Sequence, residues 1–218
     1  MKSEKKFFSA RNITYLAVLL ALVIVLQVFS GYFQIGTTRL SFVLVPITLG
    51  GMIIGVWAGL FLGLAFGLVV IIDALCGLDA FTLLLINASP ASAAFTILLC
   101  LAKGAAAGVG PALLFKFISK KNAYVATFVA ALAAPILNTG VFVVGAFCMP
   151  NVLNDVFASL GINVTGLSAA YVVFVLCVGI NFFVEFAINL VSAPAIYTVD
   201  KVVTKHINVK KVNNDTVS

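Results

Sequence analysis

The feature that most constrains this sequence is a series of long stretches without a charged residue. A helix needs about 20 apolar residues to cross a bilayer core of about 30 Å. The uncharged stretches cover residues 12–38, 40–72, 80–102, 122–154 and 156–184. The second of them is long enough for two short crossings joined by a tight turn. The series predicts an all-α fold, that of a polytopic membrane protein.

Composition excludes a soluble globular enzyme, because 63% of the residues are hydrophobic and only 9% are charged. A typical soluble domain carries about 25% charged residues. We expect a basic N-terminus (1–11), a membrane domain (12–199) and a polar tail (200–218). The membrane domain should hold six transmembrane helices, at about residues 12–33, 40–54, 59–75, 91–117, 123–147 and 166–199.

The basic residues lie in three patches, which predicts the orientation of the chain. Cytoplasmic loops of membrane proteins carry the excess of Lys and Arg. The patches are Lys2, Lys5, Lys6 and Arg11; Lys116, Lys120 and Lys121; and Lys201, Lys205, Lys210 and Lys211. Both termini and the 116–122 loop should therefore be cytoplasmic, in a multi-pass protein of the cell membrane. The net charge of +6 is not concentrated on one face, so it does not indicate nucleic-acid binding.

Sequence signatures of catalysis are missing. The chain has no Walker A sequence and no HExxH, and its one histidine, His206, falls in the tail. The four cysteines are scattered, without metal-ligand spacing. We therefore expect neither an enzyme nor a bound metal or cofactor.

Polar side chains inside the uncharged or nearly uncharged helices are the candidate functional residues, because such groups are costly in a membrane. Lys103, Asn138, Asn181 and Glu185 reach a similar depth near the midplane when helix length is counted at about 1.5 Å per residue. Asn181 and Glu185 share one helix face with Asn189. We therefore expect a polar cavity between the last three helices. The alternative is that Lys103 and Glu185 neutralise each other and the amides only join helices.

Three further features bear on this cavity. Pro135 removes a backbone donor next to Asn138 and predicts a kink or break there. Arg39 lies on an expected external loop, where it could close over a ligand or simply be solvated. Glycines recur every four residues from Gly51 to Gly67, a spacing that allows close helix packing.

In these elements the sequence resembles the substrate-binding S components of energy-coupling factor (ECF) vitamin transporters, over about residues 9–206. The shared elements are a basic N-terminus before Ala17-x-x-x-Ala21, a glycine-rich hairpin with the turn Gly55-Val56-Trp57-Ala58-Gly59, a cationic residue in the fourth helix and the stretch Pro135-x-x-Asn138-Thr139-Gly140. Size, expected topology and motif order agree as well.

The resemblance implies a subunit that binds a vitamin or vitamin precursor, while a membrane coupling protein and two ATPase subunits supply the energy. It implies that Ala17 and Ala21 dock on the coupling protein. It also implies a ligand site at Arg39, Asn87, Lys103, Asn138, Asn181 and Glu185. An anionic ligand such as pantothenate would suit Lys103 or Arg39. Folate, biotin, riboflavin and a thiamine or pyridoxine precursor stay open, as do a membrane enzyme and a helical bundle without a ligand.

Overall fold

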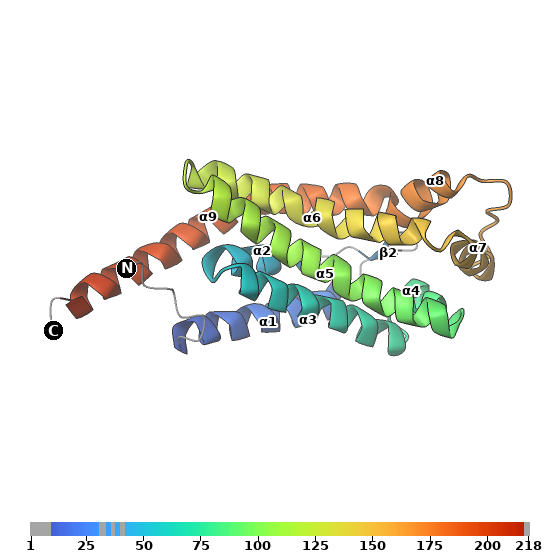
Figure 1. Ribbon diagram of the computed structural model, residues 1–218, viewed down its shortest axis with the longest axis horizontal. Helices are drawn as coiled ribbons and strands as arrows, with labels where there is room; N and C mark the ends of the chain where they lie inside the picture. Colours follow the sequence, from blue (N-terminus) through green and yellow to red (C-terminus); the bar gives the residue numbers. More distant parts are fainter. Residues whose placement is uncertain (1–9, 31–33, 36–37, 40–41, 216–218) are drawn as a thin grey trace.

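Long helices run the length of the molecule (Figure 1). The computed structural model describes residues 10–30, 34–35, 38–39 and 42–215. The helices are α1 (Ala10–Ser30), α2 (Leu44–Ile53), α3 (Val56–Leu75), α4 (Ala80–Asn87), α5 (Pro90–Ile118), α6 (Ala123–Phe147), α7 (Pro150–Ser159), α8 (Ala169–Tyr171), the π-helix η1 (Val172–Val178) and α9 (Gly179–Asp215). Two short antiparallel strands, β1 (Gln34–Ile35) and β2 (Thr38–Arg39), follow α1.

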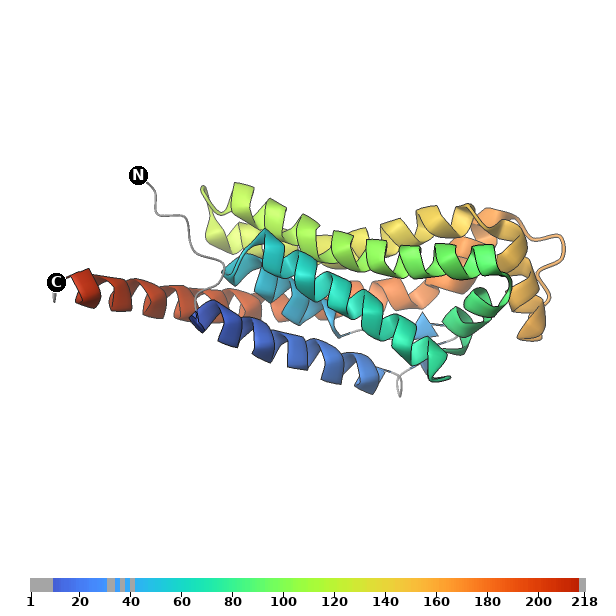
Figure 2. The ribbon, with the colours of Figure 1, turned by 60° about the horizontal axis from the view of Figure 1, so that its bottom comes forward.

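Within the described residues, five helices are long and apolar enough to cross a membrane: α1, α3, α5, α6 and the 181–203 part of α9. The prediction of a polytopic all-α membrane protein is confirmed. The second expected crossing, at about residues 40–54, is shorter than predicted. Its helix α2 has ten residues and spans only about 15 Å, about half of the bilayer core. The strands β1 and β2 lie between the two ends of the bundle in Figures 1 and 2, and α2 lies nearer the basic end than they do.

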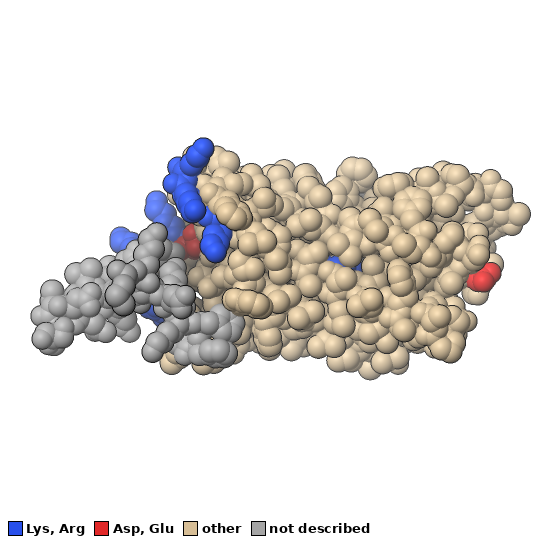
Figure 3. Space-filling model, in the orientation of Figure 1, with Lys and Arg blue, Asp and Glu red and all other residues tan. Residues whose placement is uncertain are grey.

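One end of the bundle is basic. The start of α1, the turn from α5 to α6 and the last part of α9 lie together at this end, and α4 and α7 lie at the other (Figures 1 and 2). Lys and Arg side chains gather over the first end, while the middle of the molecule is almost free of charge on the face shown in Figure 3. This is the arrangement expected when the basic end faces the cytoplasm.

Glycines bring α3 and α5 into backbone contact. A Cβ on Gly63 would collide with the carbonyl of Gly104, and one on Gly59 with the carbonyl of Gly108. A Cβ on Gly67 would lie 2.6 Å from the carbonyl oxygen of Cys100. The predicted close packing therefore occurs, although its main partner is α5 rather than the neighbouring α2. These contacts fix the height of α5, and with it the height of Lys103.

The last expected helix is broken. Residues 172–178 form a π-helix, and Gly179, where α9 begins, adopts φ +39° and ψ −139°. By contrast, α6 runs as one helix through Pro135, where a kink or break was expected. π-helical turns and left-handed glycines interrupt the regular backbone ladder, and they occur often at functional sites. The helix that follows continues to Asp215, into the segment expected to be a polar tail.

Candidate functional site

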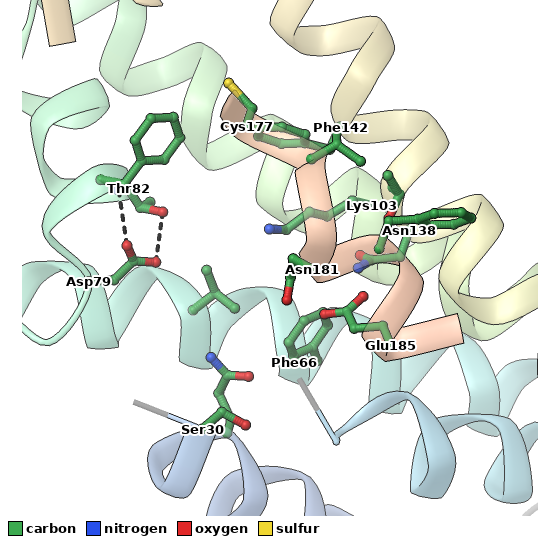
Figure 4. Close-up of a pocket in the computed structure, with 16 residues that line it drawn as sticks. Ser30, Phe66, Asp79, Thr82, Lys103, Asn138, Phe142, Cys177, Asn181 and Glu185 are labelled. Carbon is green, nitrogen blue, oxygen red and sulfur yellow. Dashed lines mark hydrogen bonds between the residues drawn. The ribbon is translucent and has the colours of Figure 1, made fainter. Parts of the chain in front are cut away.

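A cavity lies inside the bundle at the level of the helix break. The volume that the centre of a water-sized molecule can occupy is about 100 Å³. This is several times the volume that a single water molecule requires. Side chains from α1, α3, α4, α5, α6, η1 and α9 surround it (Figure 4). Its lining residues are Gln27, Ser30, Phe66, Val70, Asp79, Phe81, Thr82, Lys103, Asn138, Thr139, Phe142, Cys177, Val178, Asn181, Phe182 and Glu185. More than half of these side chains are polar or charged, and the others, four phenylalanines among them, supply apolar surface.

Four of the predicted site residues meet at this cavity. Lys103 enters from α5, Asn138 from α6, and Asn181 and Glu185 from α9 (Figure 4). Asn189, on the same face of α9, is fully buried outside it and donates from Nδ2 to the backbone carbonyl of Glu185 (2.9 Å). Counting depth along each helix thus located these four side chains.

Lys103 supplies the positive charge of the cavity wall. Its Nζ lies 5.9 Å from the ring centroid of Phe142, a geometry that favours a cation. Among the sixteen lining residues drawn in Figure 4, no hydrogen bond joins Lys103 to Glu185. The alternative of a locked Lys103–Glu185 pair is therefore not what the structure shows, and the ammonium group is directed into open space.

Three amide oxygens belong to the remaining polar wall. Within the described part of the chain, the side-chain oxygens of Gln27, Asn138 and Asn181 are buried without a hydrogen-bond partner. A buried polar atom without a partner costs about 1–3 kcal/mol. Three such oxygens around one cavity indicate that a bound solute or water completes the site.

A short capped helix forms the outer side of the cavity. Asp79 caps α4, accepting from the backbone N–H of Thr82 (3.1 Å) and from its Oγ1 (2.8 Å). Both residues line the cavity. No role was predicted for Asp79 from the sequence. The Asp-x-x-Thr spacing before an apolar run was the signal that could have identified the cap.

Sequence reasoning also missed the contribution of α1. Gln27 donates from Nε2 to Oδ2 of Asp73 on α3 (3.2 Å), and both side chains are buried. Gln27 and Ser30 line the cavity. Asp73 belongs to α3, within the expected helix at 59–75, but its buried contact with Gln27 was not predicted. An amide within the first apolar helix and a carboxylate at the end of the third were the signals for this contact.

Of the other two predicted site residues, Asn87 does not join this group, and the side chain of Arg39 is not described. Asn87 is exposed at the end of α4 and does not line the cavity, since the turn into α5 directs it away from the bundle. The backbone of Arg39 pairs with Gln34 in the two-stranded hairpin, and its side chain lies outside the described residues.

Comparison with known proteins supports the same interpretation. The sequence model of the family described as "ECF transporter, substrate-specific component" matches residues 11–197. This chain is an S component of the ECF transporter family. No curated protein matches the chain.

S components are the membrane-embedded substrate-binding subunits of transporters for vitamin-type solutes, and at the level of the family they are not enzymes. They act together with an ECF module of coupling protein and ATPases. In this S component the apolar surface around the bundle faces lipid. The cavity at Lys103 lies in the interior of a multi-pass membrane protein, where a solute would be shielded from the hydrocarbon.

Proposed function

We propose that this S component binds an anionic vitamin or vitamin precursor in the cavity at Lys103, and that pantothenate is its ligand. The observation that carries the proposal is the Lys103 ammonium group, which is directed into the cavity with the Phe142 ring 5.9 Å away. A cation in a cavity inside the bundle favours a carboxylate, because the attraction between the two charges is stronger there than in bulk water.

The rest of the wall complements the remainder of such a ligand. Pantothenate carries one carboxylate, one amide and two hydroxyl groups. The unpartnered oxygens of Asn138 and Asn181 require hydrogen-bond donors, which its hydroxyl and amide groups offer. Phe66, Phe142 and Phe182 supply apolar surface for its two methyl groups.

The test is to purify the protein alone and titrate it with pantothenate, folate, biotin, riboflavin, thiamine and pyridoxine by isothermal calorimetry. We expect saturable binding of pantothenate at one site, without chemical change of the ligand. Tight binding of thiamine instead would assign the main role to Glu185 and overturn the anionic ligand. Conversion of a ligand to product would overturn the assignment as a binding subunit.

We further propose that Ala17 and Ala21 form the surface that docks on the coupling protein in the bacterial plasma membrane. Both are exposed on α1, while Leu19 and Val23 on the opposite face are buried. Two small side chains one turn apart leave a flat strip on which another helix can approach closely. The two ATPase subunits would then supply energy through that coupling protein.

A further inference from the structure

The face of α1 that borders the cavity carries two polar side chains, each with an oxygen that can accept a hydrogen bond. Gln27 and Ser30 lie three residues apart, and therefore on the same side of the helix. Both line the cavity. Figure 4 shows Ser30 on α1, across the cavity from the side chains of α5 and α6.

The orientation of the Gln27 amide is fixed by its neighbour. Its Nε2 donates to the carboxylate of Asp73 (3.2 Å), and a carboxylate cannot donate in return. Oε1 is therefore the atom left over, and it is buried without a partner among the described residues. Gln27 is 4% exposed and Asp73 is 3% exposed, so water from outside the bundle does not compete for this contact.

Ser30 is fixed in the same sense. Its Oγ donates its one hydrogen to the carbonyl of Leu26 (2.6 Å), one turn earlier in α1. The hydroxyl oxygen then retains only lone pairs for any other partner. Both polar side chains on this part of α1 therefore present an acceptor oxygen, and each is held in place by a hydrogen bond that it donates to the protein.

We propose that Gln27 and Ser30 form a donor-selecting subsite, in which Gln27 Oε1 accepts a hydrogen bond from a hydroxyl or N–H group of the ligand. Asp73 is a positioning residue, because it acts on the ligand only through the Gln27 amide. The subsite rests on the proposed function, since it needs a ligand in the cavity. It adds a requirement that Lys103 does not impose: the ligand must carry a donor at the end that faces α1.

A cycle of ligands and variants tests the subsite. The ligands are pantothenate and two analogues, each lacking one of its two hydroxyl groups. The variants are Gln27→Met, which removes the acceptor at similar length, and Gln27→Glu, which serves as the matched control. In its protonated form the new carboxyl group donates its O–H to Asp73 and still presents an oxygen acceptor to the cavity. The measured quantity is the ratio of the dissociation constants of analogue and pantothenate within one protein, so a general loss of stability does not affect it.

For the wild-type protein we expect one of the two analogues to bind about 10- to 100-fold more weakly than pantothenate. This loss of affinity on removal of one hydroxyl group is the hydroxyl penalty. Gln27→Glu should keep most of the hydroxyl penalty, and Gln27→Met should remove it. The same penalty in Gln27→Met and wild type would overturn the subsite, because Gln27 would then stabilise the fold without contacting the ligand.

The Asp73→Asn variant gives an independent test that leaves Gln27 in place, and it serves if Gln27→Met does not fold. An asparagine can donate as well as accept, so the Gln27 amide is no longer held in one orientation. We expect the hydroxyl penalty to shrink, and an unchanged penalty would overturn the positioning role of Asp73.

The wild-type titration separates the two proposals. Binding of pantothenate with no dependence of the penalty on residue 27 would refute the subsite alone. If another vitamin of the panel binds instead, the pantothenate assignment is refuted, and the same cycle is run with that vitamin and an analogue lacking one donor. If no vitamin binds, both proposals are refuted.

Discussion

Replacing Lys103 by methionine should remove the preference of the protein for a carboxylate while leaving its fold intact. Methionine matches the length of the lysine stem, so the apolar part of the side chain still packs against its neighbours in α5 and α6. The half-buried ammonium group is lost, and with it the 5.9 Å contact to the Phe142 ring. Among the described residues, no hydrogen bond depends on the Lys103 ammonium group.

The size of the effect follows from the role given to Lys103. A hydrogen bond to a charged group contributes about 1.5–3 kcal/mol. Since about 1.4 kcal/mol corresponds to a factor of ten, pantothenate should bind about 10- to 150-fold more weakly to Lys103→Met. Pantothenol, which has an alcohol in place of the carboxylate, should bind the variant and the wild type about equally.

The assay is calorimetric titration of both ligands into wild type, Lys103→Met and Lys120→Met. Lys120 is a matched control, because its Nζ also lies near an aromatic ring, 6.0 Å from Phe117, but at the exposed basic end. Lys120→Met should bind both ligands as wild type does. If Lys103→Met retains the wild-type ratio of pantothenate to pantothenol affinity, the lysine does not contact the carboxylate and the reasoning fails.

Three further predictions concern docking and packing. Ala17→Trp should bind ligand normally in the purified protein but abolish cellular uptake, whereas Val191→Trp on the exposed side of α9 should affect neither; loss of binding in Ala17→Trp would contradict the docking role. Gly63→Ala should lower the free energy of unfolding by about 1–3 kcal/mol, because the added Cβ meets a carbonyl of α5. The added Cβ of Gly140→Ala meets nothing within 4 Å, so this control should be neutral when both variants are measured by thermal unfolding. Asp79→Ala should cost about 0.5–2 kcal/mol through the lost cap of α4, and an unchanged unfolding temperature would count against that cap.

The long apolar helices and the depth of their residues could be predicted from the sequence, because both follow from hydropathy and from the rise of a helix. Lys103, Asn138, Asn181 and Glu185 were expected at one level, and all four line the cavity. Each lies well inside a long apolar helix, so an error of a few residues at the helix ends hardly changes its depth. The existence of the cavity was therefore accessible before its walls were known.

Helix breaks could not be predicted with the same success. Pro135 stands out in the sequence, yet α6 continues through it, and the interruption occurs at Gly179. A proline within a membrane helix can be tolerated when neighbouring helices satisfy the freed carbonyl. Gly179 gives no comparable local signal, because glycines are frequent in membrane helices and most of them serve packing.

The contribution of α1 was missed for another reason. Gln27 and Asp73 are 46 residues apart, and each taken singly fits an ordinary position near a helix end. Their relation depends on how α1 packs against α3, which no local pattern records. Asn87 was instead assigned to the site wrongly. A polar residue near Pro90 fits a site from sequence alone, but in the structure the start of α5 directs Asn87 outward.

The most direct test of the central claim is a crystal structure of the protein with pantothenate bound. The ligand should lie inside the bundle, with its carboxylate at Lys103 and a hydroxyl group toward Gln27. Density for the ligand elsewhere, for example in the surface groove between Asn154 and the 161–167 segment, together with an unchanged cavity at Lys103, would contradict the claim.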